Sequence, residues 1–494
     1  MMSETRYKLH PVSAVISFVK GLKDLIFPIV ILFFVGGSGG SDGGFFSYLP
    51  YIFTGLALLL YLVSGLIKWW KFVYWFEDGE LRIEYGLFVK KKRYIPFERI
   101  QSLDYTESIF HRPFGLVKVK VETAGGGIGE AEAELTAIRL EAAEQIKQEM
   151  LAAKRQTVTV SGEEMVPENE SPPIQVKVPT DTQVLYKMTT KDLWVLAITS
   201  GGIGLIFSGA AFILSQFSEF IPYEAIYDEV VQFLRFGVMI VAAVAFAVLL
   251  ITFLISVGLT YLQNYGYTVT RDERDILIQR GLLEKKRTTI PMKRIQGIQL
   301  VENPLRQLFG YVTIVIDSAG GSVKEKSETV KLVPLLKKEK AVELLTELFP
   351  EWEWNPEFVR APKRSKKFYY RINTTSLLVV GAVLSYFFYP YGLLFFLLVP
   401  LSFALDLWSH RSTGIAVYPS YAVMQYRFIS RKTVWLEKKR IQAQVQTQTF
   451  FEKRADVASL HATIKSGALG SHHSLKAMGA TVVNETMQWF LPKR

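Results

Sequence analysis

The sequence has no cysteine among its 494 residues, and it has only six histidines. The absence of cysteine excludes disulfides, thiolate metal sites and a cysteine nucleophile. His472 and His473 form the one histidine cluster, and no carboxylate stands at ligand spacing from them, so we predict neither a metal site nor a cofactor. No set of Ser, His and Asp recurs at a fixed spacing. We therefore expect no enzyme activity.

Lysine and arginine are absent from the short links that join long apolar runs. The links at 36–50, at 218–234 and at Pro390 contain no basic residue, and nearly all of the 57 basic residues lie in three charged blocks. Basic segments stay on the cytoplasmic side of membrane proteins. We therefore predict an integral protein of the plasma membrane, with both termini and all three blocks in the cytoplasm. The net charge of +11 follows this topology, and we expect no nucleic-acid partner.

The apolar runs indicate about six membrane spans in three pairs. They lie at 25–35 with an extension at 12–19, and at 45–67, 193–217, 236–262, 376–389 and 391–407. A span needs about 20 apolar residues, which 45–67 and both runs of the second pair supply. The third pair is joined tightly at Pro390, so two full spans and a re-entrant hairpin both remain open there.

The three charged blocks are variants of one unit. Each has an Arg-Ile-Gln motif, whose repeated residues are Arg99 and Gln101, Arg294 and Gln296, and Arg440 and Gln442. A basic run precedes each motif, and the three runs are Lys90, Lys91, Lys92 and Arg93; Lys285, Lys286 and Arg287; and Arg431 and Lys432. The unit of two spans and one soluble domain is therefore used three times.

Within a unit the pattern predicts short antiparallel strands followed by one helix. Asp78-Gly79 between two strand patterns is a strong hairpin signal, and apolar residues at helical spacing follow at about 140–153. We expect a small β-barrel closed by a C-terminal helix, because closure removes exposed strand edges. The predicted span pairs are 12–70, 186–263 and 370–409, the domains are 71–155, 264–350 and 412–492, and a flexible linker occupies 156–180.

At these motifs the sequence resembles a known family. A strand, a Gly-Leu with a basic run, Ile-Pro, Arg-Ile-Gln, Phe-Gly and Ala-Gly-Gly resemble the bacterial pleckstrin-homology-like domain of the YdbS/YdbT-type membrane proteins. The third unit departs from the pattern, since Glu437 replaces the proline and Asp456 replaces a glycine. The resemblance implies a bacterial protein with cytoplasmic pleckstrin-homology (PH) domains, a link to envelope stress or antimicrobial-peptide tolerance, and a related single-unit membrane protein as partner.

Two interpretations of the basic runs remain open. Each run is predicted on a strand near the inner leaflet, where each lysine can add about 1 kcal/mol of attraction to anionic lipid headgroups. Alternatively, the lysines lie on the solvated face of an edge strand, where they guard against aggregation. The repeated Arg and Gln residues similarly allow a recurring interface or hydrogen bonds inside each barrel.

One small-residue pattern lies within the second pair of spans. Ser200, Gly204 and Ser208 recur at every fourth residue, which predicts a close helix-packing face.

The favoured hypothesis is a non-enzymatic membrane protein whose domains bind lipid headgroups or a partner membrane protein. The alternative is a six-span transporter or exporter of a peptide or lipid. The spans carry almost no ionisable residue at mid-depth, which disfavours an ion-coupled carrier.

Overall fold

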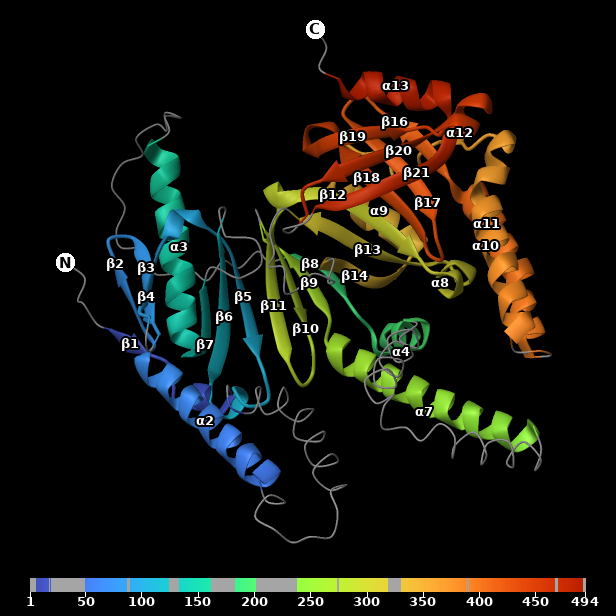
Figure 1. Ribbon diagram of the computed structural model, residues 1–494. Coiled ribbons are helices and arrows are strands. Elements are labelled where there is room, and N and C mark those ends of the chain that lie inside the picture. The colour runs from blue at the N-terminus through green and yellow to red at the C-terminus, as the bar shows by residue number, and fades with distance from the viewer. Residues whose placement is uncertain are drawn as a thin grey trace, which may run out of the picture. The chain divides into compact units, whose positions relative to one another are not determined.

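The computed structural model describes residues 6–16, 18, 49–86, 89–123, 133–160, 183–200, 238–272, 275–318, 330–387, 389, 391–466 and 470–491. The chain forms two compact units. Unit 1 comprises Met1–Asp181 and Leu283–Pro291, and unit 2 comprises Thr182–Leu282 and Met292–Arg494. Figure 1 labels the helices and strands of both units.

Unit 1 contains two antiparallel sheets. The first has the order β1-β2-β3-β4, with β1 at Tyr7–Lys8, β2 at Val73–Glu77, β3 at Glu80–Tyr85 and β4 at Lys91–Pro96. The second has the order β7-β6-β5-β11, with β5 at Ile100–Glu107, β6 at Leu116–Thr123, β7 at Ala133–Arg139 and β11 at Lys285–Pro291. Strand β11 follows the other strands of unit 1 by more than a hundred residues in sequence, so a strand of the predicted domain 264–350 pairs with the sheet of the predicted domain 71–155.

The predicted hairpin at Asp78-Gly79 is present. Strands β2 and β3 pair in antiparallel register, and both turn residues have positive φ, 52° for Asp78 and 72° for Gly79. Two consecutive positive φ values give the turn that matches the twist of a two-residue hairpin. Leu81, Ile95 and Val119 from both sheets are buried in one core.

Unit 2 has three groups of strands. The first has the order β10-β9-β8, with β8 at Gln183–Lys187, β9 at Thr268–Arg271 and β10 at Asp275–Arg280. A seven-stranded sheet has the order β14-β13-β12-β18-β17-β16-β15. The third group has the order β19-β20-β21. The bounds are β12 Ile295–Glu302, β13 Tyr311–Ser318, β14 Val330–Lys337, β15 Val359–Arg360, β16 Gly414–Val417, β17 Tyr421–Arg427, β18 Arg431–Glu437, β19 Ile441–Thr447, β20 Val457–Ile464 and β21 Ser471–Gly479.

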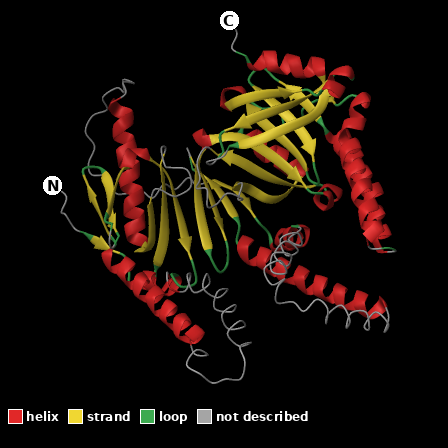
Figure 2. Cartoon of the chain, in the orientation of Figure 1, coloured by secondary structure: helices red, strands yellow, loops and turns green. Residues whose placement is uncertain are grey.

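The sheets are shared between successive domains, which differs from the expected set of three self-contained barrels. Strand β18 of the third domain pairs with β12 of the second, and β11 of the second pairs with β5 of the first. The next domain therefore pairs with the edge strand β5 of the first domain and with the edge strand β12 of the second domain. Sheet edges must be covered in some way, and here the neighbouring repeat covers them instead of closure within one domain. Figure 2 shows all described strands in yellow and the helices in red.

A helix follows the last strand of each domain. Helix α3 (Leu140–Val160) packs on β6 and β7, α9 (Lys338–Leu348) packs on β13 and β14, and α13 (Ala480–Phe490) packs on the sheet of β19 to β21. Ile146 of α3 and Val483 of α13 are fully buried, because their faces close the cores. Helix α3 includes the first five residues of the predicted linker, 156–160, and residues 161–182 lie outside the described part of the chain.

The apolar helices are α2 (Leu49–Lys71), α4 (Thr190–Thr199), α7 (Val238–Asn264), α10 (Lys366–Phe387) and α11 (Leu398–Ser412). Within the described residues, one stretch is both long and apolar enough to cross a membrane, Gly392–Ser412, and Leu250–Asn264 is a shorter apolar helix. The expected number of about six spans is therefore supported by one clear candidate, and the other spans stay predictions. Runs 25–35 and most of 193–217 lie outside the described residues.

Helices α10 and α11 pack as a hairpin. An added Cβ at Gly381 of α10 would lie 3.1 Å from the ring of Phe396, in the 3-10 helix Tyr391–Leu397 that precedes α11, so a larger residue would require this ring to shift. The side-chain amide of Asn373 donates to the carboxylate of Asp406 at 2.9 Å and joins the two helices.

Candidate functional site: the basic runs and the loops beside them

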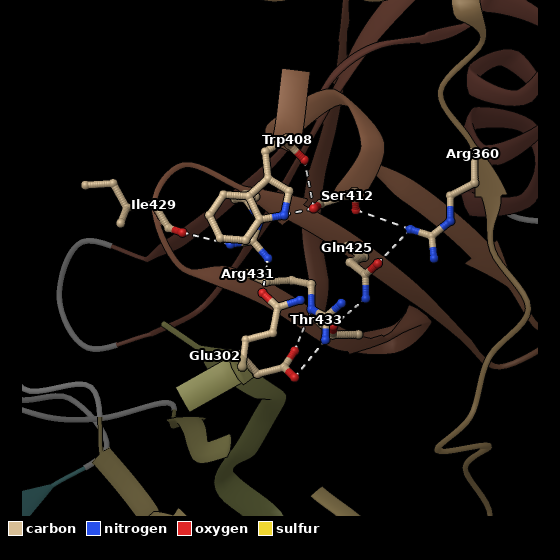
Figure 3. Close-up of polar contacts among 10 residues, drawn as sticks. Glu302, Arg360, Trp408, Ser412, Gln425, Ile429, Arg431 and Thr433 are labelled. Atoms are coloured by element: carbon tan, nitrogen blue, oxygen red, sulfur yellow. Dashed lines mark hydrogen bonds and ion pairs between the residues drawn. The ribbon is translucent and has the colours of Figure 1, made fainter. Parts of the chain in front are cut away.

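The third basic run lies in the seam between β12 and β18. Arg431 stands opposite Glu302 in the strand register, and its guanidinium donates two hydrogen bonds to the Glu302 carboxylate, at 2.6 and 2.7 Å (Figure 3). The Glu302 side chain is 6% exposed and that of Arg431 is 22% exposed. A bidentate pair with this burial is a specific strand-to-strand contact. Lys432, the other residue of the run, lines a cavity of about 240 Å³ in unit 2.

Arg427 fastens the turn between β17 and β18 to the end of α11. Its guanidinium lies 3.8 Å from the centre of the Trp408 ring, and its Nε donates to the Ser412 hydroxyl at 3.0 Å. Nη1 donates to the carbonyl of Ile429 at 3.0 Å, inside the turn itself. Burial lowers the pKa of Arg427, and the neighbouring Arg431 lowers it further.

A series of side-chain hydrogen bonds lies beside this turn. Arg360 donates to the side-chain oxygen of Gln425 at 2.6 Å, and the Gln425 amide donates to the Thr433 hydroxyl at 2.9 Å (Figure 3). Burial lowers the pKa of Arg360. These bonds align β15, β17 and β18 beneath the end of α11.

The second basic run repeats the same strand register with looser side-chain contacts. Lys285 stands opposite Glu107 on β5, Lys286 opposite Thr106, and Arg287 opposite Tyr105. The side chains of Lys285 and Arg287 are exposed although their backbones are paired. Burial raises the pKa of Tyr105. Pairing of this strand therefore leaves the side chains of Lys285 and Arg287 at the surface.

Lys91, Lys92 and Arg93 of the first basic run lie on β4, at the end of the first sheet of unit 1, and Lys90 directly precedes this strand. Lys90 forms an ion pair with Glu84 at 3.3 Å, and Lys91 and Lys92 are exposed. The guanidinium of Arg93 lies 5.8 Å from the centre of the Tyr85 ring. Within the described residues, β3 is the strand that pairs with β4.

The repeated Arg and Gln residues lie where the first sheet of each domain leads into the second. Arg99 is exposed, and the side chain of Gln101 lies outside the described atoms. Gln296 donates to the carbonyl of Arg294 at 3.0 Å. Arg440 donates to the Lys293 carbonyl at 3.0 Å, which joins the second domain to the third, and Gln442 is exposed. The motif therefore has different contacts in each copy, and both interpretations of it stay open.

The described part of the predicted span 193–217 ends at Ser200. The Ser200 hydroxyl donates to the carbonyl of Leu196 and accepts a hydrogen bond from Arg306 at 3.4 Å. Gly204 and Ser208 lie outside the described residues, so the helix-packing face stays a prediction.

Exposed apolar side chains gather on loops that touch the ends of the apolar helices. In the turn after β17, Phe428 is 86% exposed and Ile429 is also exposed, directly beside the contact of Arg427 with α11. In the second domain, α8 (Pro304–Leu308) carries Leu308, which is 77% exposed.

The loop of α8 is held to the end of α4. Asn303 donates to the Thr199 carbonyl at 2.6 Å, and Arg306 donates to the Thr199 hydroxyl at 3.1 Å. Burial lowers the pKa of Arg306 to about 10.

The sequence carried a signal for the turns before the basic runs, because each run follows a pair of apolar residues. These pairs are Leu87 and Phe88, Leu282 and Leu283, and Phe428 and Ile429. Sequence reasoning assigned no role to these pairs.

The corresponding loops of the other two domains have the same character. In the third domain α12 (Phe450–Arg454) exposes Phe450 and Phe451, and Arg371 of α10 lies 5.3 Å from the Phe451 ring. In the first domain Phe110 and Phe114 are exposed, and Phe114 contacts the ring of His10.

A buried polar cluster lies between the second and third domains inside unit 2. His473 accepts or donates a hydrogen bond with the Tyr426 hydroxyl at 3.0 Å, and its Nε2 lies 3.8 Å from the Asp317 carboxylate. Burial lowers the pKa of His473 to about 4 and raises that of Asp317. Within the described residues no group of three His, Cys, Asp or Glu side chains is arranged to hold a metal ion.

Comparisons with known proteins agree with the repeated unit. The model of the bacterial PH domain family matches the chain three times, at residues 28–154, 212–351 and 375–493. The chain is 32% identical to the UPF0699 transmembrane protein YdbT of Bacillus subtilis (strain 168), over 99% of both chains. No solved structure matches the chain.

Proposed function

Because this chain is a membrane protein that belongs to the bacterial PH domain family, we propose that its three domains lie against the inner leaflet and bind anionic lipid headgroups without catalysing a reaction. In the proposed orientation both termini and all three domains are cytoplasmic. The envelope-stress role and the related single-unit partner implied by the resemblance stay predictions.

One observation carries the proposal. The turn after β17 exposes Phe428 and Ile429 while Arg427 holds the same turn to Trp408 and Ser412, at the end of the candidate span Gly392–Ser412. A turn fastened to the end of a span lies at the depth of the headgroups. Exposed aromatic and aliphatic side chains beside basic residues are the usual composition of a surface that dips into this layer.

The other loops support the same orientation. The turn before β11 is bonded to the end of α7, where the Leu282 amide donates to the Leu262 carbonyl at 2.9 Å. The α8 loop is bonded to α4 and exposes Leu305, Leu308 and Phe309. Several apolar tips therefore contact the ends of different apolar helices, which a soluble surface would not require.

Lipid crosslinking in the whole protein tests the proposal. The full chain is reconstituted in nanodiscs that contain an anionic lipid with a photoreactive group near the headgroup, and the crosslinked peptides are identified by mass spectrometry. We expect crosslinks at the turn 427–430 and the loop 303–310. The exposed residue Val417, near the opposite end of β17, is the matched control and should stay unlabelled.

The double variant F428S/I429S should lose the crosslinks at its own turn and retain those at 303–310. Equal labelling of Val417 and the turn, or unchanged labelling in F428S/I429S, would refute lipid contact at this surface. Replacing the anionic lipid by a neutral one separates headgroup charge from simple proximity, since each nearby lysine contributes about 1 kcal/mol only with an anionic surface.

A further inference from the structure

Within the described residues, strand β4 has one edge without a neighbouring strand, whereas the equivalent edge is covered in both other domains. In the register set by Arg99, Arg294 and Arg440, the strands β4, β11 and β18 are equivalent. Strand β11 is covered by β5 and β18 is covered by β12, both antiparallel. Within the described part of unit 1, the order β1-β2-β3-β4 leaves the outer edge of β4 without a neighbouring strand.

The outer edge of β4 carries backbone groups that point away from β3. The Phe97 amide donates to the Gly79 carbonyl at 3.0 Å, across the register that continues from Pro96 opposite Glu80. Backbone groups alternate between the two sides of a strand, so those of Lys92 and Tyr94 point outward. Lys438 and Ser420 make the same bond at the end of β18, and there the outward residues Arg431, Thr433 and Trp435 face β12.

The lysines of the first basic run do not prevent this edge from pairing with another strand. Lys285 and Lys286 occupy the same positions on β11, and Arg431 and Lys432 occupy them on β18. Both of those strands are paired with a neighbouring strand despite the basic residues. Guarding against pairing therefore does not account for the run.

The two covered edges show which residues the pairing strand carries opposite each position. An acid stands opposite the first basic residue in both, Glu107 opposite Lys285 and Glu302 opposite Arg431. An aliphatic residue stands four positions before that acid, Leu103 on β5 and Ile298 on β12. Ile298 lies opposite Trp435, which is 1% exposed, whereas Tyr94 at the equivalent position of β4 is 53% exposed.

A second copy of this chain does not offer a matching strand. Strands β5 and β12 are already paired, and β19 is the equivalent strand of the third domain. On β19, Gln444 replaces the aliphatic residue and Gln448 follows the strand in place of the acid. Val445 at the middle of β19 is exposed, so β19 has the polar character of a terminal repeat.

From this pattern we infer that β4 is a docking edge for an antiparallel strand of a different polypeptide. The docking strand has an aliphatic residue opposite Tyr94 and an acid opposite Lys90. It extends the first sheet of unit 1 as β5 and β12 extend the other two. The inference is independent of lipid contact, since pairing uses the backbone and leaves lysine side chains exposed, as Lys285 shows.

Two peptides from the chain itself test this inference. Peptide 293–304 contains β12 with Ile298 and Glu302, and peptide 439–450 contains β19 with glutamines in their place, while both begin with Lys-Arg-Ile-Gln. The full chain has no cysteine, so Lys92→Cys introduces a unique one on β4. Leu300 lies opposite Thr433 on β18, the equivalent of Lys92, so the β12 peptide carries Leu300→Cys.

The measured quantity is the rate of disulfide formation between K92C protein in nanodiscs and each peptide in a thiol–disulfide buffer. We expect the peptide with Leu300→Cys to react roughly tenfold faster than the same peptide with Val301→Cys, whose cysteine points to the other face. We also expect it to react faster than peptide 439–450 carrying Gln446→Cys.

Variants at Tyr94 separate backbone pairing from side-chain attraction. In the K92C protein, Tyr94→Pro removes an outward N–H and should abolish the reaction, because proline is tolerated on an edge but cannot donate to a new strand. Tyr94→Phe should retain it. Equal rates for all three peptides, no reaction with any of them, or an unchanged rate in Y94P would overturn the inference. Disulfide-linked dimers of a K92C/Q446C chain would overturn it in favour of a second copy.

Discussion

Neutralising Glu302 should loosen the seam between β12 and β18. Its side chain is 6% exposed, and its carboxylate accepts two hydrogen bonds from Arg431. Its negative charge also stabilises the charged form of Arg427. Removing one partner of a buried ion pair costs about 3–5 kcal/mol, because the other charge stays buried without compensation. Arg431 is 22% exposed and keeps some hydration, so we expect Glu302→Gln to cost about 2–3 kcal/mol.

Hydrogen exchange of the β18 amides in the whole protein measures this cost. A loss of about 2–3 kcal/mol corresponds to roughly 30- to 150-fold faster exchange wherever opening of the seam limits the rate. The equivalent variant Glu107→Gln is the matched control, because Glu107 stands opposite an exposed lysine and should cost less than about 1 kcal/mol at β11.

The double variant E302Q/R431M tests whether the unpaired Arg431 charge causes this cost. It removes both charges, so exchange should be slower than in E302Q alone, since no unpaired guanidinium remains at position 431. The reasoning fails if E302Q accelerates exchange no more than E107Q does, or if the double variant exchanges faster than E302Q.

Three further predictions concern the same units. Trp435→Ala should cost about 3–5 kcal/mol in unfolding free energy, because a fully buried ring is lost, whereas Tyr94→Ala on the open edge should cost less than about 1 kcal/mol; thermal unfolding in detergent compares the two. Arg427→Lys should weaken the contact of the turn with α11 by about 1–3 kcal/mol, because lysine lacks the planar fork that covers Trp408 and bonds Ser412, and the accessibility of Trp408 to a fluorescence quencher reports it. His473 has a folded pKa of about 4, below its unfolded value near 6.5, so its contribution to stability is full above pH 6.5 and falls by roughly 3 kcal/mol as the pH decreases toward 4. The raised pKa of Asp317 acts in the opposite sense, so the measured quantity is the difference in unfolding free energy between the wild type and His473→Gln from pH 6.5 to 4. An identical pH dependence of the two proteins would refute the prediction.

The sequence predicted the features that local chemistry determines. The hairpin at Asp78-Gly79 is present because those two residues tolerate positive φ. The repeated unit was visible because equivalent residues keep the same spacing, and the family matches agree with it. Helices follow the last strands because apolar residues recur there at helical spacing, whereas the closed barrel stays a prediction.

The shared sheets were not predictable in the same way. The alternation of side chains shows which face of a strand is buried, but it does not show which strand lies along its edge. The partner of Arg431 is Glu302, 129 residues away in the chain. The third basic run therefore looked like a surface feature, although the structure places Arg431 in a specific contact between domains.

The depth of the turn after β17 tests the central claim most directly. In the cysteine-free chain, Phe428→Cys and Val417→Cys are each labelled with a bimane fluorophore, and the protein is placed in nanodiscs containing lipids with a nitroxide near the headgroup. The two positions are separated by about the length of β17, roughly 20 Å, which exceeds the range of contact quenching. We predict strong quenching at position 428 and little at 417. Equal quenching at both positions, or none at 428, would contradict the account.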